Sequence, residues 1–446
     1  MDEGRIPHLI VAGTTKTLLL TETPPGSANV GEIILRDLVR HVGVSRVHCV
    51  AIAGPKYRWV PDPSLAGLAV DRLESTRTHG RHGQGSKWSA PSAHLRFRLG
   101  FGREVRRLVA AVLERTRTAG VDQVFAVLNN ALMLAVGHRV AKALGVPLVT
   151  LVWDPPEYFL QQARFDRWSR AVLLQDFRAS LVASRRVAVV SETMQQDYAA
   201  WTQAPIQILR HGLPTDAGLA TATLGEPPRD EWVVGFAGSM YSNDAWRAFL
   251  KALDSVGWQV AGRPLRLKVL SGRIDLASHA RARIDYLGFR PPEEVQRILS
   301  DCHLFYMPQP FVPHLRELCR YSFPTKLTNY LALGRPVLAH APAESSLSAF
   351  LARHLVGELA SSLESTPILA ALDRLLGDES AYAEACRQAT TTARAEFSAG
   401  VFHAATEQLL DADVPREMPS AAACEEKSES PAGVLIEAHD HEEHPR

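Results

Sequence analysis

Residues 322–337 read Ser322-Phe323-Pro324-Thr325-Lys326-Leu327-Thr328-Asn329-Tyr330-Leu331-Ala332-Leu333-Gly334-Arg335-Pro336-Val337. The pattern predicts a loop, a short amphipathic helix that stops at Gly334, and a strand over residues 337–339 that a proline introduces. The first amides of such a helix have no partner within the helix, and the helix dipole adds partial positive charge to them. Lys326 adds a full positive charge. The unit is therefore suited to hold a diphosphate.

The composition of the chain around this unit is that of a globular protein with two or three domains. Of its 446 residues, 46% are hydrophobic and 22% are charged, and a single core seldom grows to this length. The net charge of +1 predicts no nucleic-acid partner. Five scattered cysteines without a C-x-x-C pair are typical of buried thiols in a reducing compartment.

Apolar runs alternate with helical patterns in the first half of the chain, which is typical of a parallel α/β sheet. The predicted strands cover residues 17–21, 47–53, 124–128, 148–152 and 187–190. A turn-rich loop over residues 24–31 follows the first strand, and a helix begins after it. Another helix is predicted over residues 132–144, where Gly145-Val146-Pro147 ends it.

A second unit begins after a polar, proline-rich linker over residues 223–230. Its predicted strands cover residues 232–238, 265–270, 284–288 and 304–307, and the 322–337 unit follows them. From residue 411 onward acidic residues outnumber basic ones and apolar residues are sparse. We therefore expect residues 411–446 to form a disordered acidic tail.

The 322–337 unit resembles the donor-site helix of GT-B glycosyltransferases, especially family 4, in which Phe-Pro-Ser-Lys precedes Glu-Tyr-Leu-Ala-x-Gly-x-Pro-Val. Other segments resemble family motifs in the same order along the chain, namely residues 189–194, 208–213, 235–241, 284–289 and 397–402. The resemblance implies two Rossmann-like domains, residues 17–222 and 231–396, that face each other across a cleft. It also implies a crossover helix, residues 397–410, that returns to the N-terminal domain. Residues 1–16 are then an N-terminal extension.

The resemblance implies an enzyme of the EC 2.4 class, a hexosyl- or related glycosyltransferase. Such an enzyme moves a sugar from a nucleotide-diphosphate donor to a glycan, lipid-linked or small-molecule acceptor, with retention and without a metal or cofactor. Charge develops on the diphosphate that leaves, so the main task of the protein is electrostatic stabilisation. Lys326 is then catalytic, and the donor site is expected to comprise Gly238, Ser239, Arg320, Thr325, Lys326 and Asn329.

Two positions of the donor motif depart from the family. Asn329 stands where the family usually carries a ribose-binding Glu, and Tyr321 stands where it carries a second Glu. An amide offers one acceptor oxygen, whereas a carboxylate offers two. Glu317 is a candidate substitute from the preceding loop. For Arg320, donor binding and a surface ion pair with Glu317 both stay open.

The acceptor side is expected at the carboxyl ends of the first-domain strands, where ligands bind in open α/β sheets. Trp153-Asp154 resembles the His-Asp position of the family, which implies that Asp154 is catalytic and orients a hydroxyl of acceptor or sugar. A helix N-cap before Pro155 and Pro156 accounts for Asp154 equally well. Asn29 and Gly31 occupy the loop where the family places its acceptor-proximal glycines.

Residues 72–107 are basic and contain interleaved aromatic residues, so contact with an anionic membrane or a lipid-diphosphate acceptor is an alternative to a solvated surface. The apolar run near the N-terminus is too short for a signal peptide, and no stretch reaches the roughly 18 to 20 apolar residues of a membrane span. We expect a cytoplasmic protein, with peripheral contact at the cytoplasmic face of the membrane left open.

Two other functions stay open. One is a catalytically weak GT-B subunit that binds a partner glycosyltransferase or a glycan, which the missing Glu pair favours. Donor binding without turnover would distinguish that subunit from an enzyme. The other is a non-hydrolysing sugar-nucleotide epimerase, which needs several carboxylates and histidines around the donor, and which Tyr321 and Asn329 disfavour.

Overall fold

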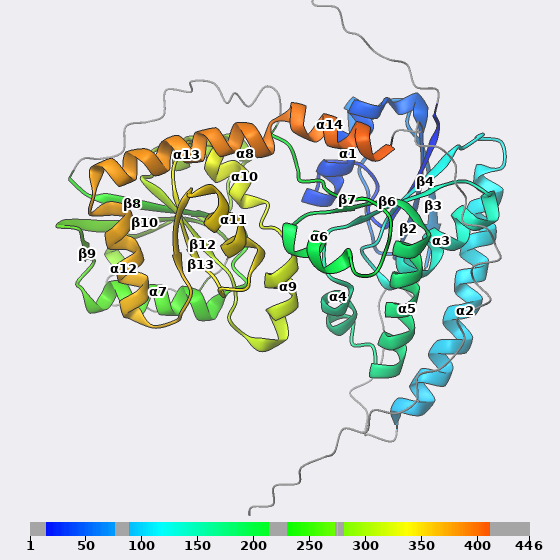
Figure 1. Cartoon of the computed structure of the whole chain (residues 1–446), viewed down its shortest axis with the longest axis horizontal. Helices are drawn as coiled ribbons and strands as arrows, with labels where there is room; N and C mark the ends of the chain where they lie inside the picture. The colour runs from blue at the N-terminus through cyan, green and yellow to red at the C-terminus, as the bar shows by residue number, and fades with distance from the viewer. Residues whose placement is uncertain (1–14, 76–88, 214–229, 273, 275–280, 411–446) are drawn as a thin grey trace, which may run out of the picture. The chain divides into compact units, whose positions relative to one another are not determined.

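The computed structural model describes residues 15–75, 89–213, 230–272, 274 and 281–410 (Figure 1). Nearly all of the predicted N-terminal extension, most of the predicted linker and the whole predicted tail lie outside these residues. Within them, no helix combines the length and the apolar content that crossing a bilayer requires.

The first domain is built on one parallel sheet whose strand order is β3-β2-β1-β4-β5-β6-β7. The strands are β1 (Thr17–Thr21), β2 (Val47–Ala53), β3 (Ala69–Glu74), β4 (Gln123–Val127), β5 (Leu148–Val152), β6 (Ser184–Val189) and β7 (Ile206–Ile208). Every residue of the central strands β1, β4 and β5 is buried, as expected where helices cover both faces of a sheet. The strand order reverses between β1 and β4, which is the switch point of a doubly wound fold.

The second domain repeats this plan with the strand order β11-β10-β8-β12-β13-β14. Its strands are β8 (Trp232–Ala237), β9 (Gln259–Val260), β10 (Arg263–Leu270), β11 (Ile284–Tyr286), β12 (Leu304–Pro308), β13 (Val337–His340) and β14 (Gly357–Ala360), of which β9 pairs antiparallel with β10. The switch point lies between β8 and β12. The prediction of two Rossmann-like domains is confirmed.

Helices cover both faces of each sheet (Figure 1). The first domain contains α1 (Val30–Val42), α2 (Ser89–Thr116), α3 (Ala131–Leu144), α4 (Pro156–Gln162), α5 (Arg167–Ala183) and α6 (Glu192–Tyr198). The second contains α7 (Asn243–Ser255), α8 (Pro292–Ser300), α9 (Arg316–Tyr321), α10 (Lys326–Ala332), α11 (Ser346–His354), α12 (Ser365–Leu376) and α13 (Glu379–Phe397). In the first sheet, Leu18 and Leu20 pack with α2, α3 and α5, whereas Leu19 packs on the other face with α1. The alternation of side chains along a strand thus builds two cores.

The last helix, α14 (Ala399–Leu410), belongs to the first domain although it follows the second in sequence. Its Phe402 and Leu409 are buried in the same core as α1, beside which α14 runs in Figure 1. Gln207 Nε2 donates to Ala405 O at 2.5 Å, and Gln123 Nε2 donates to Leu410 O at 3.0 Å. The predicted return of a C-terminal helix to the N-terminal domain is confirmed.

Arg210 connects segments of both domains in a buried charge cluster. Its side chain is 4% exposed and donates to Glu192 Oε2 and, at 3.2 Å, to Glu396 Oε2. The guanidinium carbon lies 4.1 Å from the ring centroid of Phe323 and 5.2 Å from that of Phe350. A cation with two carboxylate partners and two aromatic faces is well compensated for its burial.

Candidate active site

Lys326 lies against the loop that follows β8, which brings three of the predicted donor residues together. Its Nζ donates to the carbonyl oxygen of Ser239 at 2.8 Å. The neighbouring Gly238 has a φ of 103°, and a Cβ at this position would lie 2.7 Å from Lys326 Cε. Glycine is suited to both this conformation and this close approach. The loop and the ammonium group therefore lie together at the carboxyl end of β8, where ligands bind in such sheets.

Burial gives the ammonium group of Lys326 an unusual electrostatic environment. It lies 4.5 Å from the ring centroid of Phe236 and 5.9 Å from that of Tyr241. Burial lowers the pKa of Lys326 from 10.5 to about 8, and no carboxylate among the described residues offsets this shift. An anion that binds here would meet a partly desolvated cation, which strengthens their attraction.

Helix α10 carries the other predicted donor residues of this segment. Thr325 precedes the helix, and its side chain makes no capping bond. Asn329 lies one turn after Lys326 and is exposed. Tyr330 is buried, and its hydroxyl accepts a hydrogen bond from the backbone amide of Ala237 at 2.8 Å. This bond fixes α10 to the end of β8 and leaves Thr325 and Asn329 available to a ligand.

The backbone of residues 320–325, which comprises the end of α9 and the loop after it and which we call the junction loop, is held by three hydroxyl groups. Thr193 and Ser191, at the start of α6 in the first domain, donate to the carbonyls of residues 320 and 321 at 2.5 Å each. Ser346, at the start of α11, donates to the carbonyl of residue 322 at 2.6 Å. Three successive carbonyls are thereby satisfied from both domains, which restricts the conformation of the loop.

Two side chains of the junction loop bind one carboxylate of the first domain. Arg320 Nη2 and the Tyr321 hydroxyl both donate to Asp197 Oδ2, at 2.7 and 2.6 Å. Arg320 is therefore ion-paired as the sequence allowed, but with Asp197 rather than with Glu317. Its part in donor binding stays a prediction. The phenol at the position of the second family Glu is engaged by Asp197.

Asp154 follows β5 and accepts a hydrogen bond from Ser322 Oγ at 2.5 Å. Helix α4 has Pro155 as its N-cap, with no side-chain capping bond, so Asp154 is not the helix cap that the sequence allowed. Burial raises the pKa of Asp154, and the bond from Ser322 lowers it by a smaller amount. The predicted acceptor-side carboxylate thus contacts the loop that leads to Lys326.

The predicted acceptor-proximal residues lie at the start of α1. Asn29 is the N-cap: its Oδ1 accepts from the Glu32 amide at 3.0 Å, and its Nδ2 donates to Glu32 Oε1 at 2.9 Å. Gly31 lies against Trp153, because a Cβ on it would be 3.0 Å from that ring. The structure brings Gly31 next to Trp153-Asp154 and shows Asn29 as a helix cap. Their role toward an acceptor stays a prediction.

Sequence reasoning assigned no role to Ser322, Asp197 or Tyr330, although all three organise the site. Their hydrogen-bond partners lie 168, 124 and 93 residues away in sequence. A contact between residues so far apart in sequence produces no local motif. The only indication in the sequence was that Ser322 directly precedes Phe323-Pro324 of the donor motif.

The basic segment 72–107 largely forms the first half of α2 in the part that the structure describes, while residues 76–88 lie outside it. Phe97 and Phe101 are buried under the helix, whereas Leu95 and Leu99 are 60% and 63% exposed. Phe97 and Phe101 are therefore core residues, and Leu95 and Leu99 supply exposed apolar surface in the described part of the segment.

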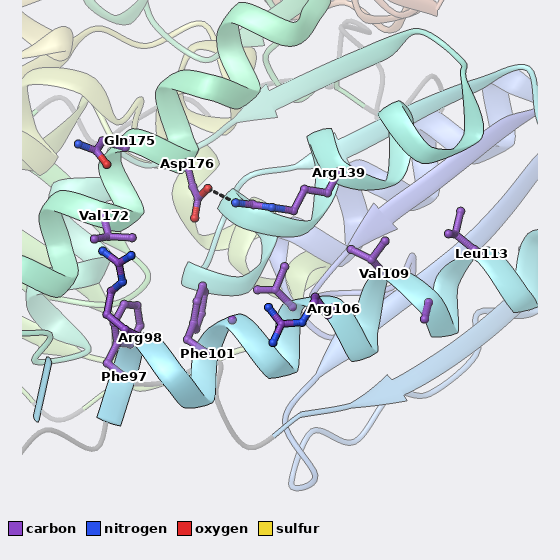
Figure 2. A pocket seen from close by; sticks show the side chains of 13 residues that line it. Phe97, Arg98, Phe101, Arg106, Val109, Leu113, Arg139, Val172, Gln175 and Asp176 are labelled. Atoms are coloured by element: carbon purple, nitrogen blue, oxygen red, sulfur yellow. Dashed lines mark hydrogen bonds and ion pairs between the residues drawn. The ribbon is translucent and has the colours of Figure 1, made fainter. Parts of the chain in front are cut away.

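Helices α2, α3 and α5 enclose a pocket of about 650 Å³ beside this segment (Figure 2). Its walls include Phe101, Val109 and Val172, and the guanidinium groups of Arg98 and Arg106 lie along it. No ion pair of either arginine occurs within the described residues. Gln175 and the ion pair of Arg139 with Asp176, at 2.7 Å, also line the pocket, so its walls are partly apolar and partly polar. It is formed by helices that cover the sheet rather than by the strand ends.

The comparisons with known proteins concern the fold and the second domain. Residues 231–378 match the family model "Glycosyl transferases group 1", and a search of curated proteins finds no match. Sucrose-phosphate synthase from Thermosynechococcus elongatus is a similar solved structure, with a TM-score of 0.57 and 16% identity over 88% of this chain and 98% of that chain. HepE from Anabaena, solved in complex with UDP and glucose, has a TM-score of 0.54 and 15% identity over 88% and 99%.

A third similar structure is the alpha,alpha-trehalose 6-phosphate synthase from Burkholderia multivorans, with a TM-score of 0.59 and 13% identity over 89% of this chain and 98% of that chain. At these identities the likeness concerns the fold. It spans both domains, whereas the family match lies within the second domain, around Gly238, Ser239 and Lys326. The chain therefore has the GT-B fold, and residues 231–378 of its second domain are similar to the group 1 glycosyl transferases.

Proposed function

We propose that this protein transfers a sugar from a nucleotide diphosphate to an acceptor hydroxyl, with retention of configuration and without a metal or cofactor. The observation that carries the proposal is Lys326, a partly desolvated cation held 2.8 Å from the carbonyl of Ser239 in a group 1 domain. A cation in a preorganised, low-dielectric site stabilises the charge that develops on a diphosphate leaving group. Gly238, Thr325 and the exposed Asn329 complete the proposed donor site.

The similar structure of HepE with UDP and glucose supports UDP as the first nucleotide to test. Asn329 would offer the ribose one acceptor oxygen. Asp154 would orient the acceptor, a glycan, a lipid-linked sugar or a small molecule, near Gly31 and Trp153. A cytoplasmic site of action is consistent with the use of nucleotide sugars.

A thermal-shift screen with UDP-, GDP-, ADP- and dTDP-sugars tests the donor site. A ligand at a hundred times its Kd stabilises the native state by about 2.7 kcal/mol, so we expect one nucleotide class to raise the Tm by several degrees. The shift should vanish in Lys326→Ala and persist in Lys251→Ala, which removes an exposed lysine of α7.

The absence of a shift with every nucleotide would show that the donor site is wrong. A shift without transfer to any glycan, lipid-linked or small-molecule acceptor would favour the catalytically weak subunit. Interconversion of the free nucleotide sugar would favour the epimerase.

We also propose that α2 touches an anionic membrane. The exposed Leu95 and Leu99 lie beside Arg98, Arg103 and Arg106, which are exposed as well. Each basic residue near such a surface contributes about 1 kcal/mol, and apolar side chains add to this. We expect the full chain to float with phosphatidylserine vesicles at low salt, and Leu99→Glu to lose most of this binding. Leu363→Glu, at another exposed leucine, serves as the control. Equal flotation of both variants would contradict the assignment.

A further inference from the structure

The Asp154 carboxylate has one oxygen engaged and one available. Oδ1 accepts from Ser322 Oγ at 2.5 Å, and within the described part of the chain neither a hydrogen bond nor an ion pair reaches Oδ2. The charge of Asp154 acts on the phenols of Tyr158, on α4, and Tyr241, after β8: burial raises the pKa of both, and the carboxylate raises it further. A short hydrogen bond on one oxygen thus leaves the other free to accept from a substrate hydroxyl.

The position of the Ser322 hydroxyl is set by the backbone that carries it. Its amide donates to Leu318 O at 2.9 Å, and its carbonyl accepts from Ser346 Oγ. The two preceding carbonyls are held by Thr193 and Ser191 of the first domain. Lys326, four residues later, contacts the Gly238–Ser239 loop. One short segment therefore contacts both the acceptor-side carboxylate and the donor-side cation.

We propose that Ser322 is a positioning residue that orients the Asp154 carboxylate for the transfer reaction, so that the donor loop of the second domain also completes the acceptor side of the first. This inference rests on the proposed function. With Oδ1 fixed by Ser322, Oδ2 is directed to a hydroxyl of the acceptor or the transferred sugar. The same bond favours the ionised carboxylate, which is the form that accepts a hydroxyl proton.

Carbon-13 NMR of the full chain, labelled at its aspartate carboxyl carbons, tests the contact without requiring turnover. The Asp154 signal is assigned by its loss in Asp154→Asn. Because the bond from Ser322 lowers the pKa of Asp154, Ser322→Ala should move the titration midpoint to higher pH, and Ser322→Thr should restore it. Thr193→Ala, which removes a neighbouring bond of the junction loop but no contact of Asp154, should leave the midpoint in place.

Kinetics with the donor found in the nucleotide screen test the role. Ser322→Ala should lower kcat about tenfold, since misorientation of a catalytic group slows the chemical step more than binding, and change the donor KM little. The acidic limb of kcat/KM should move to higher pH with the NMR midpoint, and Ser322→Thr should recover both.

An unchanged NMR midpoint in a folded Ser322→Ala variant would overturn the contact. A shifted midpoint with an unchanged kcat and acidic limb would overturn the positioning role. If no nucleotide sugar binds the wild-type protein, the proposed function fails separately, and the NMR result still decides whether Ser322 orients Asp154.

Discussion

Lys326→Met is expected to abolish donor binding and at the same time to make the free protein more stable at neutral pH. Methionine fills a similar volume without a charge, so the variant removes the desolvated ammonium and leaves the packing against Phe236 and Gly238 largely intact. The pKa of Lys326 is about 8 in the folded protein and 10.5 in its ordinary state. This difference means that burial of the charged ammonium lowers the free energy of unfolding by roughly 3 kcal/mol at neutral pH. Because the variant also loses the bond to Ser239, which contributes about 1 kcal/mol, we expect a net gain in stability of about 2 kcal/mol.

The dependence on pH fixes the sign of this effect. Between pH 8 and 10.5 the folded protein binds fewer protons at Lys326 than the unfolded chain does, so the wild-type stability rises with pH over this window. The gain in the free energy of unfolding that Lys326→Met brings over wild type should be complete below pH 8 and absent above pH 10.5. Urea unfolding at pH 7 and pH 10.5 measures both, with Lys251→Met as the matched surface control.

Donor affinity should change in the opposite direction from stability. The diphosphate favours the charged amine, so the Kd of the wild-type protein should rise as the pH increases through about 8. A Lys326→Met protein that is less stable than wild type at pH 7 would show that burial does not penalise the ammonium group. A donor Kd that does not change between pH 7 and 9.5 would show that Lys326 does not bind the diphosphate.

Arg210→Met is expected to lower the free energy of unfolding by about 3 kcal/mol or more, because it leaves carboxylates without their buried cation. Glu192 keeps one other partner, Arg353 at 2.9 Å, which is itself half exposed. The double variant Arg210→Met/Glu192→Gln should regain part of the loss, since it removes the uncompensated charge.

Calorimetry measures the stability of these variants against that of Arg374→Met. This control breaks the ion pair of Arg374 with Glu358, in which the arginine side chain is 55% exposed. Such exposed pairs contribute about 1 kcal/mol or less, so Arg374→Met should change the stability little. If Arg210→Met lowers the free energy of unfolding no more than Arg374→Met does, the buried charge cluster is not a major contribution to the stability of the fold.

The sequence predicted the central strands well and the edge strands poorly. Residues 17–21, 47–53 and 148–152 are runs in which apolar residues predominate, and β1, β2 and β5 have these bounds. The strands that were not predicted, β3, β7, β9 and β14, lie at sheet edges or off the main path. They are short or half exposed, as with Asp71 and Arg72 in β3, because an edge strand needs less apolar surface and carries a weaker signal.

For the candidate site, sequence reasoning named residues but not their hydrogen-bond partners. Lys326, Gly238 and Ser239 were predicted from family motifs, and the structure places them in contact. The bonds of Asp154 to Ser322 and of Arg320 to Asp197 join separate domains, and such pairing depends on how the two sheets are connected. Nothing in the spacing of a linear sequence encodes that connection, so Asp154 looked equally like a helix cap.

The hydroxyl groups that hold the junction loop also bear on how the protein responds to changes in ionic strength. At physiological ionic strength charges are screened over about 8 Å, and over about 3 Å in 1 M salt. The exposed contact of Arg320 with Asp197 weakens under these conditions, whereas the bonds from Ser191, Thr193 and Ser346 to backbone carbonyls carry no net charge. Added salt would therefore weaken the ionic contact before the hydroxyl bonds, so that the junction loop, which leads directly to Lys326, keeps its place.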